Sequence, residues 1–156
     1  ALPVCDARLL VNLSRPREGQ WFLDPCAGVG GLVREARARG ARVISSDVDP
    51  WVAMGLQKMS GWHVVADVAR IPLKEKMISA VASELPFDQS VADRLDAWMD
   101  QICAALAPMG RTALMGADWQ GEGLRGAGQR AGLSLDFELA IKRKGRNCVV
   151  QVWEKA

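Results

Sequence analysis

The sequence predicts an α/β fold, in which a mostly parallel sheet of seven strands lies between two layers of helices. Three observations lead to this prediction. Short apolar runs bounded by turn residues alternate with amphipathic segments along most of the chain, which is typical of strand–helix–strand units. The first apolar run passes through a glycine-rich loop into a helical segment. The last two runs alternate apolar and polar residues and flank a basic turn, so they predict a C-terminal antiparallel hairpin.

The first strand–loop–helix unit is WFLDPCAGVGG, residues 21–31. An apolar run ends at Asp24, and three glycines then lead into a helical segment that begins at Leu32. Glycine lets the backbone adopt positive φ and approach a ligand closely, and a helix start presents free N–H groups. The loop therefore predicts a cofactor cradle. Val33 occupies the third position of the dinucleotide pattern G-x-G-x-x-G, which disfavours an NAD-linked dehydrogenase.

The composition is that of one globular domain. Of the 156 residues, 49% are apolar and 24% are charged, and a net charge of +2 is too small to predict nucleic-acid binding by itself. The four cysteines are scattered and the chain has a single histidine, so we expect neither a bound metal nor a disulfide framework. With no recognisable signal peptide or membrane span, we expect a cytoplasmic protein with reduced thiols.

The N-terminal segment indicates a helix and leaves the extent of the protein open. Leu9, Leu10 and Leu13 have helical spacing in residues 7–14, which we interpret as a short helix covering the sheet. The first residue is Ala1 rather than methionine. We expect either that the initiator is removed, or that residues 1–156 are a single domain of a longer protein.

An acid ends the second predicted strand, residues 42–46. The spacing of Asp47 from Asp24 places both at the carboxyl ends of neighbouring strands, where an acid accepts hydrogen bonds from ribose hydroxyls. The alternative role is a helix cap, for which Asp49 is better placed because it directly precedes Pro50. We favour ribose binding for Asp47.

The third predicted strand, residues 63–66, also ends at an acid. Asp67 is suited to the amino group of adenine, and the backbone N–H of Val68 would lie near a ring nitrogen. His63 begins the strand without other ligating side chains around it, so we interpret it as structural or exposed.

A nearly continuous apolar run, residues 77–87, predicts a strand in the middle of the parallel sheet. It brings residues 83–87 to the edge that carries the three acids, and ligands bind at this edge in open α/β sheets. Ser90 and Asp93 indicate the start of the next helix. Its apolar stripe predicts core packing and comprises Val91, Leu95, Trp98, Ile102 and Leu106.

The C-terminal part predicts a strand, a short helix and a hairpin. Pro108 and Gly110 precede a strand over residues 111–117, and a glycine-rich helix follows over residues 121–132. The hairpin strands are residues 133–141 and 147–155. The basic residues between them have two explanations: contact with phosphates, or, as we favour, a solvated turn that discourages edge pairing.

Five segments in this order resemble the class I, Rossmann-like S-adenosylmethionine (SAM) methyltransferases. The resemblance covers almost the whole chain and is closest to the RNA guanine-N2 methyltransferases that carry a THUMP RNA-binding domain, and to the DPPY/NPPY amino-methyltransferases. The segments are residues 7–14, 24–36, 45–50, 66–73 and 83–87.

The resemblance implies a SAM cofactor and an RNA substrate, tRNA or rRNA, methylated on an exocyclic amine. It also implies an upstream RNA-binding domain if residues 1–156 belong to a longer chain. It places Cys26 and the glycine loop along the methionine and ribose part of SAM, Asp47 at the ribose and Asp67 at the adenine amine. The implied cofactor-binding residues are Asp24, Cys26, Gly28, Gly30, Asp47, Val48, Asp67 and Val68, and the catalytic residues are Glu84, Pro86 and Phe87.

The last of these segments, residues 83–87, departs from the family pattern, which reads Asp or Asn, Pro, Pro, and Tyr or Phe. Methyl transfer to an amine is an in-line displacement, in which a side-chain oxygen and a backbone carbonyl accept the two amine hydrogens and an aromatic ring stacks on the base. Phe87 keeps the ring. Glu84 keeps a carboxylate on a longer arm, and Leu85 restores a backbone N–H that proline lacks.

Two other functions remain in view. A non-catalytic, SAM-binding module would keep the glycine loop and lose the chemistry at Glu84 and Leu85. A methyltransferase acting on a small molecule or a protein would share the fold and differ in substrate.

Overall fold

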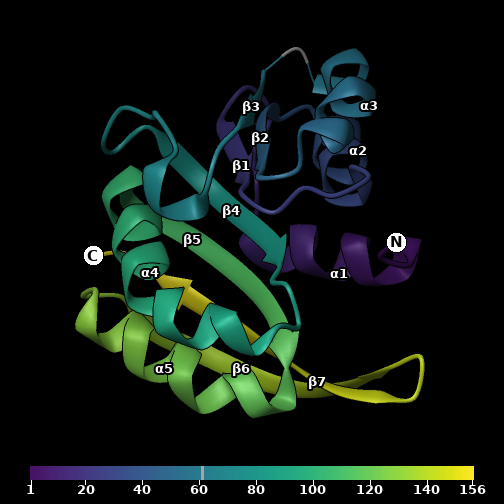
Figure 1. Ribbon diagram of the computed structural model, residues 1–156. Helices are drawn as coiled ribbons and strands as arrows, with labels where there is room; N and C mark the ends of the chain where they lie inside the picture. The colour runs from purple at the N-terminus through teal and green to yellow at the C-terminus, as the bar shows by residue number, and fades with distance from the viewer. Residues whose placement is uncertain (61) are drawn as a thin grey trace.

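The computed structural model describes residues 1–60 and 62–156, and their strands form one seven-stranded sheet in the order β3-β2-β1-β4-β5-β7-β6 (Figure 1). The pairs from β3 to β5 are parallel, and β7 pairs antiparallel with both β5 and β6. This confirms the predicted sheet and C-terminal hairpin. The strands are β1 Trp21–Asp24, β2 Arg42–Asp47, β3 His63–Val65, β4 Ile78–Glu84, β5 Leu106–Ala117, β6 Ser134–Arg143 and β7 Arg146–Glu154.

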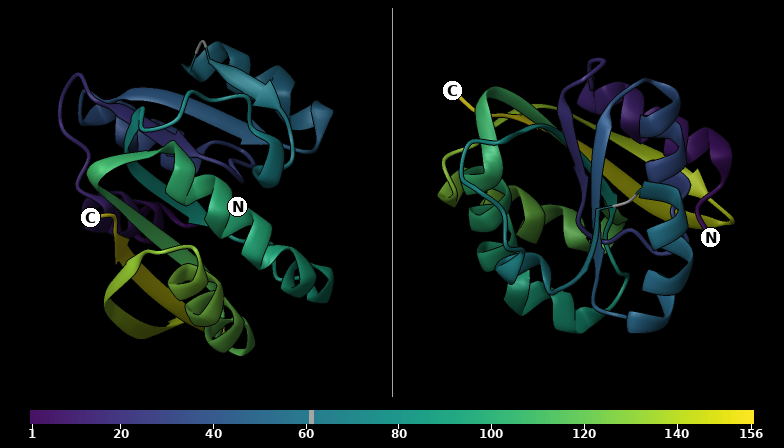
Figure 2. Two further views of the ribbon diagram at one scale, coloured as in Figure 1. Left: turned by 90° about the vertical axis from the view of Figure 1, so that its left-hand side faces the viewer. Right: turned by 90° about the horizontal axis from the view of Figure 1, so that it is seen from above.

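Helices cover both faces of the sheet, which gives the predicted three layers (Figure 2). The α-helices are α1 Val4–Ser14, α2 Gly31–Ala38, α3 Pro50–Ser60, α4 Leu95–Ala105 and α5 Gly121–Arg130. Short 3-10 helices are η1 Val68–Arg70, η2 Gln89–Arg94 and η3 Asp118–Gln120. The N-terminal helix begins three residues before the predicted segment, and α5 confirms the short glycine-rich helix.

The apolar core is divided by the sheet into two parts. Phe22 of β1 packs with α1, α2 and α3, whereas the next residue, Leu23, packs with α4 and α5. Ala80 and Val81 of β4 are divided in the same way. Because successive strand residues point to opposite faces and both faces are covered, these central strands are apolar along their length.

The order of the strands places a crevice at one edge of the sheet. From β1 the chain moves outward through β2 and β3, and it then returns to place β4 on the other side of β1. The connections after β1 and β4 therefore leave in opposite directions, and ligands bind at such points in open α/β sheets. Asp24 ends β1 and Glu84 ends β4, so both lie at this edge.

The prediction for the fifth strand was wrong at its start. β5 begins at Leu106, directly after α4, so Leu106 belongs to the strand rather than to the helix stripe. Pro108 and Gly110 lie within β5, where the register against β4 shifts between Ile78 and Ala80. An irregularity of this kind leaves residues outside the regular ladder, so a proline without an N–H donor is accommodated.

The start of the fourth helix also differs from the prediction. The carboxylate of Asp88, rather than the pair Ser90 and Asp93, provides the cap, since its Oδ1 accepts a hydrogen bond from the backbone N of Ser90 at 2.8 Å. This local turn opens η2, and α4 begins only at Leu95.

The hairpin turn is tighter than predicted. β6 continues to Arg143 and β7 begins at Arg146, which leaves Lys144 and Gly145 as the turn. Both have positive φ, 48° and 76°, as in the two-residue turns that match the twist of a hairpin.

Candidate functional site at the carboxyl ends of the strands

Asp24 joins the glycine loop to the end of β4. Its side chain is fully buried, and its Oδ1 accepts hydrogen bonds from Ser83 Oγ at 2.7 Å and from the backbone N of Cys26 at 3.3 Å. The hydroxyl of Ser83 in turn accepts from the N–H of Cys26 at 3.1 Å. Asp24 therefore ties the start of the glycine loop to the end of β4.

The environment of Asp24 favours the protonated carboxyl. Burial raises its pKa to about 7 from an ordinary value of 3.8, although the hydrogen bonds from Ser83 and Cys26 act in the opposite direction. Its second oxygen, Oδ2, is buried and has no hydrogen-bond partner among residues 1–60 and 62–156.

This pKa predicts how stability depends on pH. Between about pH 4 and about pH 7 the folded state keeps a proton that the unfolded chain has lost, so the free energy of unfolding should fall as pH rises through this range. In Asp24→Asn this contribution should be absent. Urea unfolding of both proteins across the range measures it, and parallel curves would contradict the prediction.

Asp47 holds the backbone of the glycine loop. Its Oδ2 accepts from the N–H of Gly28 at 2.9 Å, and its Oδ1 accepts from the N–H of Asp49 at 3.0 Å. Each oxygen keeps a lone pair for a further donor. Asp49 accepts from the N–H of Trp51 at 2.9 Å, so the predicted helix-capping role falls to Asp49.

The glycines of the loop have different surroundings. Gly28 has a φ of 52°, and a Cβ added there would meet no atom within 4 Å. At Gly30, where φ is 86°, an added Cβ would lie 2.7 Å from Cδ2 of Leu56. Gly30 therefore allows close packing of the loop against α3, while Gly28 shapes the loop around Asp47.

Two adjoining cavities form a cleft above the loop. A cavity of about 170 Å³ has Val48 and Val68 in its walls, and a more open one of about 570 Å³ lies beside the segment after β4. Cys26, Asp47 and Pro86 line both, so the cavities are two parts of one cleft. Its wider part is also lined by Glu84, Leu85, Phe87, Arg143, Lys144 and Arg146.

Asp67 lies beside this cleft and its carboxylate already has donors. Oδ1 accepts from the N–H of Ala69 at 2.9 Å and from Nε1 of Trp98 at 3.2 Å, and Oδ2 forms an ion pair with Arg94 at 3.3 Å. Trp98 is buried in the core, as predicted, and also holds this acid. The assignment of Asp67 to adenine stays a prediction.

His63 is half-buried, with its Nδ1 2.9 Å from Ser45 Oγ.

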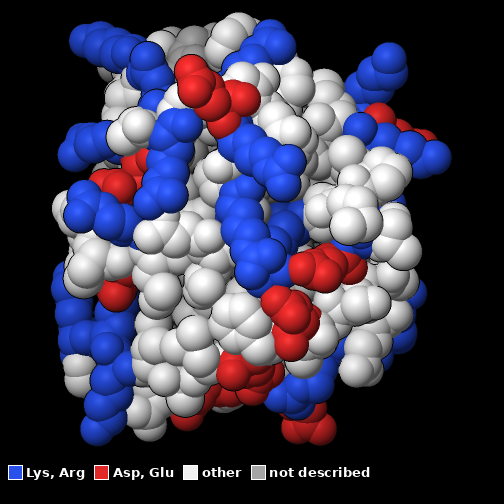
Figure 3. Space-filling view, turned by 180° about the vertical axis from the view of Figure 1, so that it is seen from behind, with Lys and Arg blue, Asp and Glu red and all other residues white. Residues whose placement is uncertain are grey.

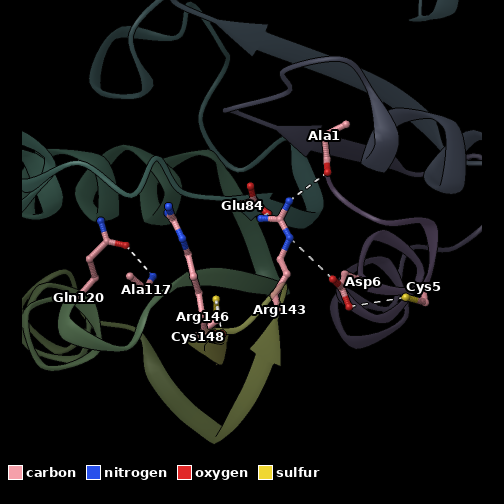
Figure 4. A network of polar contacts seen from close by, with 9 residues as sticks. All are labelled: Ala1, Cys5, Asp6, Glu84, Ala117, Gln120, Arg143, Arg146 and Cys148. Carbon is pink, nitrogen blue, oxygen red and sulfur yellow. Dashed lines mark hydrogen bonds and ion pairs between the residues drawn. The ribbon is translucent and has the colours of Figure 1, made fainter.

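Glu84 is held by a residue of β6, the outer strand on the C-terminal side of the sheet. Its Oε2 forms an ion pair with Arg143, whose side chain is only 11% exposed and whose Nη2 donates to the carbonyl of Ala1 at 3.0 Å (Figure 4). The preferred interpretation of the basic segment as a solvated turn is therefore wrong for Arg143. Along β6 alternate residues are partly buried, and this alternation places Arg143 on the same side as Ile141.

The segment after β4 leaves one carbonyl available. The N–H of Leu85 donates to the carbonyl of Met115 at 2.8 Å, which extends the parallel ladder by one residue. The next bond of the ladder would run from the N–H of Ala117 to the carbonyl of Leu85. Gln120 intervenes: its Oε1 accepts from Ala117 N and its Nε2 donates to the carbonyl of Pro86, both at 2.8 Å. Within the described residues, the Leu85 carbonyl has no hydrogen-bond partner.

Charge and metal-ligating groups are dispersed. On the face in Figure 3, basic side chains form several separate groups with acidic side chains between them. Residues 1–60 and 62–156 contain no group of three or more His, Cys, Asp or Glu side chains that could hold a metal ion. No helix in this described part is long and apolar enough to cross a membrane.

Comparison with known proteins gives relatives in sequence and in structure. No family model matches the chain. It is 34% identical over 85 residues to a tRNA (guanine(10)-N2)-dimethyltransferase of Methanocaldococcus jannaschii, a match that covers 53% of this chain and 24% of the relative. The matches span about a quarter of the length of such curated relatives.

The structural similarity covers nearly the whole chain. TrmN from Thermus thermophilus superposes with a TM-score of 0.85 at 23% identity, over 99% of this chain and 49% of TrmN. A TehB-like SAM-dependent methyltransferase from Corynebacterium glutamicum superposes with a TM-score of 0.76 at 21% identity, over 96% of this chain and 87% of that one. The chain has the class I methyltransferase fold.

In this methyltransferase fold the predicted residues occupy two kinds of position. Asp24, Gly28, Gly30 and Asp67 stand behind or beside the cleft and shape it. The predicted residues that line the cleft are Cys26, Asp47, Val48, Val68, Glu84, Pro86 and Phe87.

Sequence reasoning did not identify Arg143, which lines the cleft, or Gln120, which holds the segment after β4. Arg143 could have been found, because it stands two residues after Ile141, the last apolar residue of the alternation along β6. Gln120 carried no such signal, since its role depends on how the ends of β4 and β5 meet.

Proposed function

We propose that this chain is a SAM-dependent methyltransferase domain that methylates an exocyclic amine of a nucleobase in RNA, of the guanine-N2 type. One observation carries the proposal: the free carbonyl of Leu85 adjoins Glu84 at the cleft, and both can accept hydrogen bonds. An exocyclic amine has two hydrogens and needs two such acceptors. The names of the curated relatives support guanine in tRNA as the target.

The acceptor oxygens of Asp47 and the apolar walls of the cleft support SAM as its ligand. Asp47 would accept from the ribose hydroxyls with its remaining lone pairs, and the smaller cavity between Val48 and Val68 would take the adenine ring. Cys26 would lie along the methionine part. When bound, SAM supplies an electrophilic methyl group on a sulfonium.

Residues 84–87 would place the amine for in-line attack. Oε1 of Glu84 has no partner in the described part of the chain and would accept one amine hydrogen, while the Leu85 carbonyl accepts the other. Both contacts localise the nitrogen lone pair. Phe87, half-buried at the cleft wall, would stack on the base. The ion pair with Arg143 fixes the longer arm of Glu84, and such positioning controls rate.

Gln120 provides a test of the free carbonyl. In Gln120→Leu the N–H of Ala117 is released and can pair with the Leu85 carbonyl, so kcat should fall by about 10- to 100-fold while SAM affinity stays within about twofold. The loss of two buried hydrogen bonds should lower the free energy of unfolding by about 1–3 kcal/mol. Methyl-transfer kinetics, titration calorimetry and urea unfolding measure the three effects.

The matched control for this variant is Gln101→Leu. Gln101 lies on α4, and its Nε2 also donates to a backbone carbonyl, that of Ile71, at 3.3 Å. Its replacement should leave kcat unchanged. A folded Gln120→Leu protein with wild-type kcat would contradict the role of the Leu85 carbonyl.

The ion pair of Glu84 with Arg143 also favours a second candidate, a SAM-binding module without methyl transfer, because one carboxylate oxygen is already engaged. Replacing Leu85 with the proline of the family pattern would remove the N–H that donates to the carbonyl of Met115. Glu84→Asp, which changes the acid alone, is therefore the better variant to compare with the wild-type protein. Incubation with labelled SAM and separate RNA, DNA and protein fractions distinguishes the candidates. Transfer to RNA supports our proposal, and SAM binding without transfer supports the module.

We also propose that the protein acts in the cytoplasm. Cys5, Cys26, Cys103 and Cys148 are all free thiols, which suits a reducing compartment.

A further inference from the structure

A second hollow adjoins the cleft on the other side of Phe87. It has a volume of about 310 Å³, and its walls include Trp119 of η3 and Asn147 of β7. Phe87 and Arg146 line both this hollow and the wider part of the cleft. A ligand extending from the cleft would therefore enter the hollow past these two side chains.

Trp119 presents an aromatic surface at a fixed place. Its side chain is 49% exposed, although the turn that carries it is tightly held. The carboxylate of Asp118 accepts from the N–H of Trp119 at 2.8 Å. Gln120 joins this turn to the carbonyl of Pro86, next to Phe87. The two aromatic side chains thus belong to segments that are tied together.

The charges around the hollow favour an anionic ligand. Arg143 is neutralised by Glu84, but in residues 1–60 and 62–156 neither Lys144 nor Arg146 forms an ion pair. Figure 4 shows Arg146 extending from the hairpin toward the edge at which Glu84 lies. Asp118 is the one acid that lines the hollow, and its carboxylate already accepts from a backbone N–H.

We propose that this hollow binds the nucleotide next to the target base in a single-stranded RNA segment. The inference rests on the proposed function. The neighbouring base stacks on Trp119, and Arg146, which lines both hollows, contacts the phosphate between the two nucleotides. Stacking accepts any base, so this subsite holds the strand without reading its sequence.

The test uses a short, fluorescently labelled RNA that contains one guanine, and versions in which a base next to that guanine is removed. Trp119→Ala should weaken binding by about 5- to 150-fold, the range expected for loss of one stacked base. Removal of one neighbouring base should weaken binding to the wild-type protein similarly, and should have little further effect in Trp119→Ala. SAM affinity should not change.

Two further variants keep the test decisive. Trp62→Ala is the matched control, because Trp62 is 51% exposed and contacts Trp21 at the opposite end of β1. Arg146→Gln should weaken RNA binding and reduce its salt dependence by about one phosphate contact, without touching the core.

The outcomes separate this inference from the proposed function. The wild-type protein could methylate RNA while the losses of RNA affinity caused by Trp119→Ala and by base removal simply add. In that case the proposed subsite is contradicted and the proposed function stands. If the wild-type protein transfers no methyl group to RNA, the proposed function fails and the inference fails with it.

Discussion

Replacing Asp47 with alanine is expected to weaken SAM binding by about a hundredfold, a loss of about 3 kcal/mol. The carboxylate is the proposed acceptor for the ribose hydroxyls. It also holds the N–H groups of Gly28 and Asp49, so its removal loosens the glycine loop as well. Titration calorimetry with SAM measures the change.

The control for Asp47→Ala lies two residues away. Asp49→Ala removes the carboxylate that accepts from Trp51 N at the start of α3, and this should lower stability by about 1 kcal/mol with little change in SAM affinity. Wild-type affinity in a folded Asp47→Ala protein would remove the basis for the cofactor site.

Replacing Glu84 with alanine is expected to lower the rate of methyl transfer by about 100- to 1,000-fold, the usual effect of removing one group that stabilises the transition state. SAM affinity should stay within about twofold. The reason is that Glu84 would accept a hydrogen from the amine, whereas Asp47 and the smaller cavity hold the cofactor. Single-turnover kinetics with saturating SAM measures the rate.

A second glutamate controls for the loss of an ion pair. Glu138 of β6 pairs with Arg125 at 2.7 Å, as Glu84 pairs with Arg143, but it lies outside the cleft. Glu138→Ala should transfer methyl groups at the wild-type rate. Equal rates in the two variants would show that Glu84 has no part in the chemistry.

The sheet could be predicted because its order depends on local patterns. Residues 21–23 and 77–87 are apolar since their strands are covered on both faces, and the alternation in residues 133–141 indicates a hairpin. The start of β5 could not be found in this way. Pro108 and Gly110 usually end a strand, and only the irregular pairing with β4 admits them.

The candidate site divides in the same way. Asp24, Asp47 and Glu84 follow apolar runs, so their place at one edge of the sheet follows from parallel pairing. Their partners come from distant parts of the chain, as with Gln120 beside Leu85. A sequence pattern does not show such contacts, and the free carbonyl of Leu85 depends on one of them.

The most direct test of the account is the identity of the methylated product. Purified protein is incubated with labelled SAM and unmodified tRNA transcripts, the RNA is digested to nucleosides, and the labelled nucleoside is identified by mass. We predict N2-methylated guanosine with the wild-type protein and a strongly reduced yield with Glu84→Ala. Label on another atom, or transfer that Glu84→Ala leaves unchanged, would contradict the account.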